Sequence, residues 1–287
     1  MPIDISNIEN SIIGNKKSIN FFIKNLNDNN EGNIWMLNGP KGIGKSTLIK
    51  LISADLLNIE YNSKKEDNFF HPDLVILSKK EKKNISVDEI RNLKKLFFKT
   101  SYSGNCRIAI IDSIDDLNLY GHNALLKTIE EPPKDSFIFI INHQNSYIPA
   151  TVKSRCKLLN LSCISDNEVL KILEEMKLAN SREELFFYSK ISSGSVGDAI
   201  FFLNNKSLET YKQLCNYLIR IKDFDENDTN KIIKKIIEKK DSLILIFFKL
   251  LTLLINKVIK KKFLNQNFNI LKKERLLIEY FNKIYNE

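Results

Sequence analysis

The segment from residue 39 to residue 47 restricts the fold of this chain more than any other part of the sequence. It has the G-x-x-x-x-G-K-S spacing of a phosphate-binding P-loop. An apolar run, Ile34 to Leu37, precedes it, and a helical pattern from Thr47 to Leu57 follows it. The pattern therefore predicts a strand, a glycine-rich turn and a helix. The residues of the turn are Gly39, Pro40, Lys41, Gly42, Ile43, Gly44, Lys45, Ser46 and Thr47.

Such a turn is built to hold the phosphates of a nucleotide. Its glycines let backbone N–H groups surround phosphate oxygens, and the helix N-terminus adds a partial positive charge. We expect Lys45 to reach the β- and γ-phosphates of ATP, and Ser46 to bind Mg²⁺ through its hydroxyl group. A P-loop can also persist as a scaffold after binding is lost, so nucleotide binding and a purely structural role both remain open.

Short apolar runs alternate with helical patterns from about Ser11 to Leu161. Fully apolar strands that alternate with helices are typical of a parallel sheet covered on both faces. We therefore predict an α/β domain. Its strands are expected at Ile34–Leu37, Leu74–Leu77, Arg107–Ile111, Phe137–Ile141 and Leu158–Leu161, and its helices at Ser46–Leu57, Val87–Lys99 and Gly121–Glu130.

The remainder of the chain is predicted to be all-helical. A serine followed three residues later by glutamate is the sequence signature of a capping box at a helix start. It occurs at Ser86 with Glu89 in the α/β domain, and at Ser165 with Glu168 and Ser181 with Glu184 in the remainder. We predict a P-loop domain at 1–163, a small helical lid at 164–205 and a helical collar at 206–287. The collar helices are expected at 207–221, 229–238, 242–260 and 270–284, with a buried face that includes Leu243, Phe247, Leu250 and Leu254.

The composition indicates whether the chain folds and in which compartment it is expected. Hydrophobic residues make up 43% and charged residues 28%, as in ordinary folded proteins. The net charge of +9 suits a polyanionic partner, but the general excess of Lys, Asn and Ile explains it equally well. The N-terminus has no signal-peptide pattern, and the apolar run 243–255 is shorter than the roughly 18 residues that span a membrane. We expect a cytoplasmic protein with reduced thiols at Cys106, Cys156, Cys163 and Cys215.

A second element of a nucleotide site follows the P-loop. The apolar strand Arg107–Ile111 ends in Asp112, as a Walker B strand does when its carboxylate holds Mg²⁺ at the carboxyl end of a parallel sheet. An aspartate at a strand end is otherwise an ordinary loop residue. Its place after a P-loop favours the magnesium role.

Two longer motifs make the chain resemble a known family. The stretch from His122 to Pro133 reads HNALLKTIEEPP, and Ser154-Arg155-Cys156 follows the next apolar strand. Together with His71-Pro72-Asp73 and Asp115-Asp116-Leu117-Asn118, they resemble bacterial clamp-loader ATPases of the AAA+ superfamily, and among them the delta-prime subunits of DNA polymerase III. The resemblance extends over about residues 8 to 205.

The resemblance implies roles for individual residues. Arg155 would be an arginine finger that enters the ATP site of a neighbouring subunit. The alternative is a structural salt bridge, and the Ser-Arg-Cys context favours the finger. Asn142 would hold the sensor 1 position. AAA+ ATPases have a catalytic glutamate where this chain has Ser113, and competent relatives have a sensor 2 arginine where it has Asp198. General-base catalysis contributes roughly 10² to 10⁴ in rate, so we expect poor hydrolysis.

The same resemblance implies partners, and a departure from it argues against a zinc site. We expect gamma- or tau-type ATPase and delta subunits as neighbours, and the sliding clamp and primed DNA as partners of the assembly, which is part of a DNA-directed DNA polymerase. Residues 55–72 contain no cysteine, so the zinc module of many relatives is not expected. His71, His122 and His143 are scattered and are assigned surface or capping roles. The alternatives are an autonomous AAA+ ATPase and a small-molecule P-loop kinase, which leaves the two longer motifs unexplained.

Overall fold

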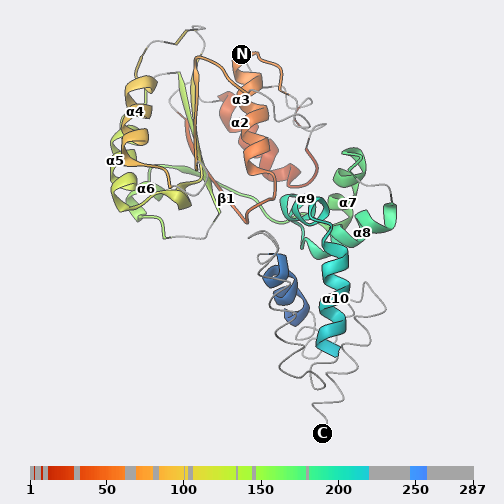
Figure 1. Ribbon diagram of the computed structural model, residues 1–287. Helices are drawn as coiled ribbons and strands as arrows, with labels where there is room; N and C mark the ends of the chain where they lie inside the picture. Colours follow the sequence, from red (N-terminus) through yellow and green to blue (C-terminus); the bar gives the residue numbers. More distant parts are fainter. Residues whose placement is uncertain are drawn as a thin grey trace. The chain divides into compact units, whose positions relative to one another are not determined.

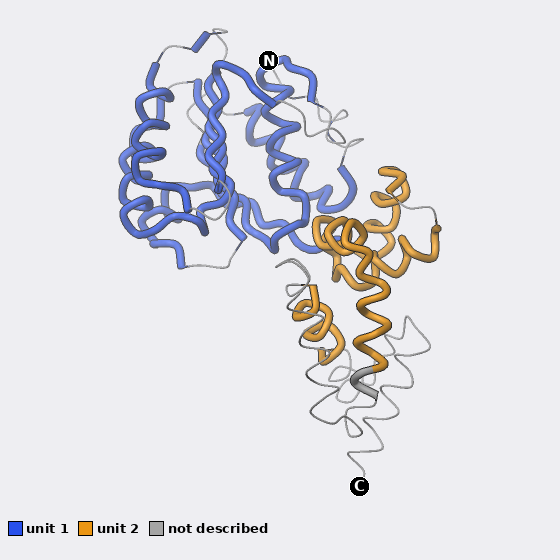
Figure 2. The backbone as a smooth tube through the Cα atoms, in the orientation of Figure 1, with its two compact units in different colours: residues 1–164 blue, residues 165–287 orange. Residues whose placement is uncertain are grey.

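The computed structural model places two compact units along the chain, residues 1–164 and residues 165–287 (Figures 1 and 2). It describes residues 3, 8, 12–28, 33–61, 69–79, 84–99, 101–102, 106–133, 135–143, 147–178, 181–219 and 246–256. The predicted helices at 229–238 and 270–284 lie outside these ranges, as do parts of the helix predicted at 242–260.

The first unit is built on a parallel sheet of five strands. Its strands run in the order β2-β3-β4-β1-β5, and every neighbouring pair is parallel. The predicted parallel sheet is therefore confirmed. The carboxyl ends of the strands meet at one edge, where Asn38 is in register with both Asn142 and Asn160. The strands are β1 Asn33–Asn38, β2 Leu74–Ser78, β3 Arg107–Asp112, β4 Ser136–Asn142 and β5 Lys157–Asn160.

Helices cover both faces of this sheet. Figure 1 shows α2 and α3 on one face and α4, α5 and α6 on the other. This double cover explains why the strands are apolar on both sides: along β4, Phe139 belongs to the core beneath α2 and α3, whereas Ile138 and Ile140 belong to the other core. The helices are α2 Lys16–Asp28, α3 Lys45–Leu57, α4 Val87–Phe97, α5 Leu119–Ile129 and α6 Ala150–Lys153, with a 3₁₀ turn, η1, at Ile114–Asp116.

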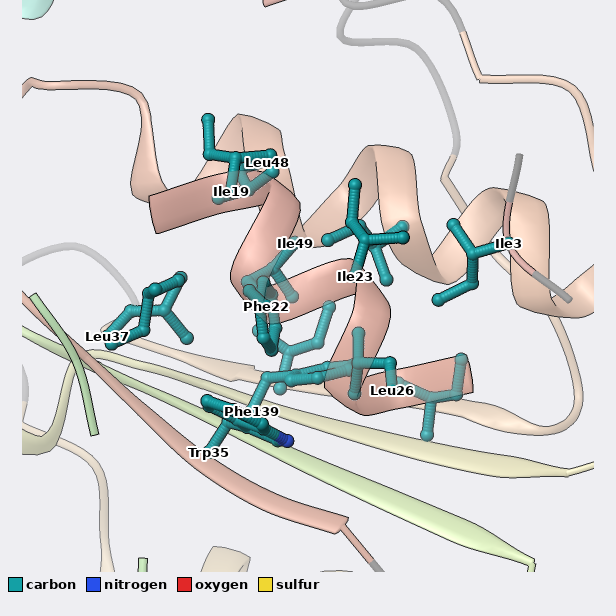
Figure 3. Close-up of a cluster of buried hydrophobic side chains, with 14 of the residues drawn as sticks. Ile3, Ile19, Phe22, Ile23, Leu26, Trp35, Leu37, Leu48, Ile49 and Phe139 are labelled. Carbon is teal, nitrogen blue, oxygen red and sulfur yellow. The ribbon is translucent and has the colours of Figure 1, made fainter. Parts of the chain in front are cut away.

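Aromatic side chains fasten α2 to the sheet. The Phe22 ring lies 4.7 Å from that of Trp35 and 6.0 Å from that of Phe139, centroid to centroid, in edge-to-face arrangements (Figure 3). All three side chains are buried. Such pairs contribute roughly 0.5–1.5 kcal/mol beyond the burial of their area. These contacts hold α2 against β1, which is the strand that leads into the P-loop.

Two of the three predicted capping boxes form. Ser86 and Ser165 each accept a hydrogen bond from the backbone N–H three residues on, and Glu89 and Glu168 complete the boxes. The third prediction is wrong, because the Ser181 side chain makes no capping hydrogen bond at the start of α8. Glu184 instead accepts a hydrogen bond from the Tyr188 hydroxyl, at 3.2 Å.

In the described part of the second unit all secondary structure is helical, and turns join the helices. Its helices are α7 Asp166–Glu175, α8 Arg182–Ile191, α9 Val196–Asn204, α10 Ser207–Ile219 and a helix at 246–256. In that last helix Ile246, Leu250 and Leu254 form the buried stripe, at the i, i+4, i+8 spacing of one helix face. Phe247, which is predicted to lie on a face that packs against other subunits, is partly exposed within this chain, since it lies off that stripe. No helix among the described residues has the length and apolarity to cross a membrane.

Candidate nucleotide site and exposed arginine

The P-loop joins the end of β1 to the start of α3, as predicted. Gly44 is the N-cap residue of α3 and has a positive φ of 93°. At Gly39 φ is 151°, and a Cβ atom would collide with the carbonyl oxygen of Leu161 on the neighbouring chain segment. Nothing lies within 4 Å of the point where a Cβ of Gly44 would stand, so the loop is open on that side. The turn is therefore closed toward the sheet and open at the helix N-terminus, where an anion binds.

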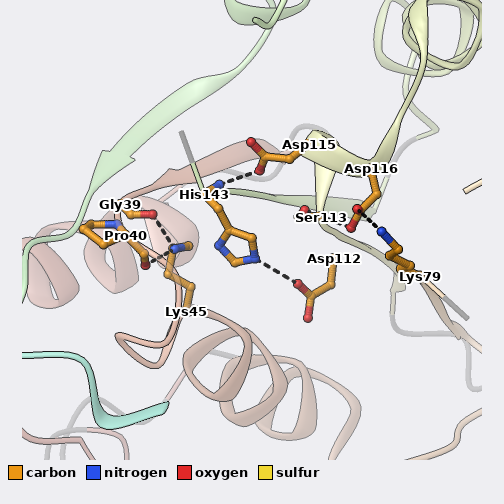
Figure 4. Close-up of polar contacts among 9 residues, drawn as sticks. All are labelled: Gly39, Pro40, Lys45, Lys79, Asp112, Ser113, Asp115, Asp116 and His143. Atoms are coloured by element: carbon orange, nitrogen blue, oxygen red, sulfur yellow. Dashed lines mark hydrogen bonds and ion pairs between the residues drawn. The ribbon is translucent and has the colours of Figure 1, made fainter. Parts of the chain in front are cut away.

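Lys45 is buried under the loop that it follows. Its ammonium group donates to the carbonyl oxygens of Gly39 and Pro40, both at 2.6 Å (Figure 4). Burial lowers the pKa of Lys45 from 10.5 to about 8, although the nearby carboxylates of Asp112 and Asp115 act in the opposite direction. The side chain thus keeps its charge at neutral pH. Lys45 thus ties the start of α3 to the turn that precedes it.

Asp112 lies at the end of β3, beside His143, for which the sequence predicts a surface or capping role. The Nε2 atom of His143 is 3.9 Å from Oδ1 of Asp112, and the backbone N–H of His143 donates to Asp115 at 2.6 Å (Figure 4). The His143 side chain is only 15% exposed. The earlier assignment is therefore wrong. The only signal in the sequence was that His143 directly follows Asn142 at a strand end.

The surroundings of His143 favour the neutral form of its imidazole. Burial lowers its pKa below 6.5, and the positive charge of Lys45 lowers it further, while Asp112 and Asp115 oppose both effects. Its Nδ1 atom is buried and has no hydrogen-bond partner within the described part of the chain. His122, which was assigned the same kind of role, is also buried, on α5.

Ser113 occupies the position where a catalytic glutamate would stand. It is 2% exposed, and its hydroxyl group donates to Asp116 at 3.3 Å. Asp116 also pairs with Lys79 at 3.4 Å, whereas Asp115 is engaged by the His143 backbone. Each nearby carboxylate thus already has a partner within the chain.

Three asparagines form a row along the carboxyl edge of the sheet. The Asn142 side chain donates to Oδ1 of Asn38 at 2.8 Å, and Asn38 donates to Oδ1 of Asn160 at 3.0 Å. The row links β4, β1 and β5 beside the P-loop. The Asn142 amide group is hydrogen-bonded within this row. Its predicted contact with a γ-phosphate stays a prediction.

The residues around the loop fit a magnesium-bound nucleoside triphosphate. The first turn of α3 offers backbone N–H groups and the partly exposed hydroxyl-bearing Ser46, and Asp112 offers a carboxylate that is 27% exposed. Hydroxyl and carboxylate oxygens are the ligands that Mg²⁺ prefers. Within the described ranges, no three His, Cys, Asp or Glu side chains lie together as a metal cluster would require.

Arg155 lies just beyond α6. Its contact with Glu130 brings together the two long motifs of the sequence. Its guanidinium group is 3.1 Å from Oε1 of Glu130, at the end of α5, and donates to the carbonyl oxygen of Thr151 at 2.9 Å. Its side chain is 38% exposed. Burial raises the pKa of the neighbouring Cys156 to about 12, and that thiol donates to the carbonyl of Val152. Cys156 therefore anchors the turn that presents Arg155.

Asp198 is engaged inside the second unit. Its carboxylate pairs with Lys249 at 2.6 Å, and the Lys249 ammonium also lies 5.4 Å and 6.0 Å from the ring centroids of Phe201 and Phe202. This contact ties the helix at 246–256 to α9. The residue that replaces the expected sensor 2 arginine thus has a structural partner 51 positions away in the sequence.

We expect the substitution K249M to loosen α9. Methionine keeps the stem of the side chain but removes the charge, and the half-exposed pair and ring contacts are worth about 1 kcal/mol. Hydrogen exchange of the α9 amides should accelerate accordingly. The matched control is K212M, which breaks the Lys212–Glu209 pair on α10. Equal protection of α9 in both variants would show that the contact contributes nothing.

Comparison with known proteins places the chain in a family. A family model described as DNA polymerase III, delta subunit, matches residues 14–165. The DNA polymerase III subunit delta' of Buchnera aphidicola subsp. Acyrthosiphon pisum is 27% identical over 87% of this chain and 78% of its own length. The Pseudomonas aeruginosa subunit delta' is 33% identical over 42% of this chain and 40% of its own length. Most of the first curated relatives are covered over about half of their length or less.

The fold has a counterpart among solved structures. A DNA polymerase III gamma subunit-related protein of Thermotoga maritima superposes with a TM-score of 0.50 over 93% of this chain and 98% of that one, at 16% identity. This likeness concerns the fold alone. The family match, in contrast, takes in the P-loop, Asp112 and Arg155 together and extends over more than half of the chain. The protein therefore belongs to the family of DNA polymerase III delta subunits.

Proposed function

We propose that this chain is a delta-prime-type subunit of a clamp loader, which helps place a sliding clamp on primed DNA in the cytoplasm. It would assemble with gamma- or tau-type ATPase subunits and with a delta subunit. In that assembly it holds ATP weakly or as a structural group, hydrolyses it poorly, and lends Arg155 to the ATP site of a neighbour. The observation that carries the proposal is the family match across residues 14–165.

The arrangement of Arg155 supports a role across an interface. Glu130 and the Thr151 carbonyl orient the guanidinium group, and more than a third of the side chain is exposed. An exposed ion pair of this kind is worth only about 0–1 kcal/mol, so Arg155 can exchange Glu130 for the phosphates of another subunit at little cost. The fork of the guanidinium matches phosphate oxygens better than a lysine ammonium would.

The chain's own site supports binding more than turnover. When ATP and magnesium are bound, they would supply the phosphoanhydride bond and its charge neutralisation, with Lys45 and Ser46 from α3 and Asp112 from β3 as their contacts. Ser113 cannot accept a proton from water at neutral pH, because a hydroxyl group is far weaker as a base than a carboxylate. Its hydroxyl already donates to Asp116.

A turnover assay on the purified full-length chain tests this proposal. We expect the wild-type chain and the variant K45A to release phosphate from ATP at the same background rate, because the residue that would activate water is Ser113. After assembly with the partner subunits, primed DNA should stimulate hydrolysis by the complex. Steady DNA-stimulated turnover by the isolated chain, abolished in K45A, would instead establish an autonomous ATPase. A failure to join the other loader subunits would overturn the proposal altogether.

A further inference from the structure

His143 stands inside the nucleotide site. Figure 4 shows its ring between the Lys45 ammonium and the Asp112 carboxylate. Its Nε2 atom is 3.9 Å from Asp112, and the Lys45 charge is close enough to act on the ring. The side chain comes from the end of β4, one residue beyond the Asn142 that carries the sensor 1 prediction.

The backbone on which this ring is mounted is tied from two sides. The N–H of His143 donates to Asp115 of η1 at 2.6 Å, and the carbonyl of the preceding Asn142 accepts from the N–H of Gly39 at 3.3 Å. Between these bonds the backbone cannot shift away from the P-loop without breaking one of them.

Packing alone does not explain the histidine. Its Nδ1 atom is buried and has no hydrogen-bond partner within the described residues, and an unpaired buried polar atom destabilises a fold by about 1–3 kcal/mol. An apolar side chain of similar size would avoid this penalty. A buried polar atom without a partner needs an explanation, and we look for it in the adjoining nucleotide site.

We infer that His143 weakens magnesium-dependent nucleotide binding, because its ring lies 3.9 Å from the Asp112 carboxylate that would hold a hydrated magnesium ion. The inference rests on the proposed nucleotide site and identifies the residue that makes it weak. Magnesium keeps most of its waters and demands oxygen ligands, so an imidazole ring beside the carboxylate takes up room that those waters would need and offers no oxygen ligand in return. The side chain would thus lower the affinity for magnesium by obstruction.

Titration of the full-length chain with a fluorescent ATP analogue tests the inference. In the presence of Mg²⁺ we expect H143A and H143N to bind the analogue roughly tenfold more tightly than wild type, and in EDTA we expect no gain. The substitution H143Q keeps a polar group at the reach of Nε2, so its affinity should stay within about twofold of wild type. The control is H71A, which removes an imidazole from the amino end of β2, at the far edge of the sheet.

Each outcome of the titration decides the inference. Affinity in H143A and H143N equal to or below that of wild type would overturn it, and so would an equal gain with EDTA, since Asp112 would then play no part. The variant K45A separates this from a failure of the site itself: if K45A binds as wild type does, the P-loop is not the binding site. If neither wild type nor the His143 variants bind the analogue, the obstruction is also refuted.

Discussion

The variant R155A is expected to reduce the ATPase rate of the assembled clamp loader about 10³-fold, which is the low end of the range for loss of an arginine finger. The Michaelis constant for ATP should change little, because the guanidinium acts on charge that develops in the transition state. Arg155 is 38% exposed and its carboxylate partner is itself at the surface, so the fold of the chain should remain unchanged. The measurement is phosphate release by the complex on primed DNA.

Two further variants sharpen this experiment. R155K keeps the charge but lacks the planar fork, so it should recover only a small part of the rate. R91A removes another exposed arginine, paired with Asp88 on α4, and should leave the rate unchanged. If R155A complexes hydrolyse ATP as fast as wild type, Arg155 is only the salt-bridge partner of Glu130. The family membership of the chain would stand in either case.

The parallel sheet could be predicted because its signals are local. Each strand is a short run that is apolar on both sides, and the two formed capping boxes depend on residues three positions apart. The P-loop is equally local, since its glycines, Lys45 and the helix that follows are contiguous. A sequence pattern is sufficient wherever the interacting groups are neighbours in the chain.

The contacts that set the character of the site could not be predicted in this way. His143 meets Asp112 across two strands, and Arg155 meets Glu130 between two helix ends. Asp198 and Lys249 are 51 residues apart. Such pairs depend on the register of strands and on how helices pack, which the pattern of one segment does not contain. The histidine was overlooked because a lone imidazole has no spacing by which to recognise it.

Local patterns also fail where two local partners compete. Ser181 and Glu184 have the spacing of a capping box, but Tyr188, one helical turn beyond Glu184, offers a hydroxyl donor on the same face. The glutamate side chain points to that hydroxyl, and Ser181 makes no capping bond. The glutamate half of the box thus has a competitor that the pattern does not include.

The variant G39A is expected to destabilise the first unit by about 3 kcal/mol. The φ of 151° at Gly39 belongs to a region that residues with a side chain rarely adopt, and the added Cβ would meet the Leu161 carbonyl, which is backbone and cannot rotate away. The N–H of Leu161 also donates to Asn38 at 2.9 Å, so relief of the clash requires β5 to separate from β1. The strain therefore falls on the sheet as well as on the loop.

Urea unfolding followed by tryptophan fluorescence measures this effect in the correct unit, because Trp35 is the single tryptophan of the chain and is buried on β1. The matched control is G121A, on α5. There a Cβ would meet side-chain atoms and no backbone: Leu117 at 3.1 Å and Oδ1 of Asn118 at 3.5 Å. Alanine favours the helix by about 1 kcal/mol, so the G121A midpoint should lie close to that of wild type. A G39A midpoint equal to that of wild type would mean that the turn tolerates a side chain. The closed side of the P-loop would then not require glycine, and the loop geometry would have to be held by Lys45 and its two carbonyl contacts alone.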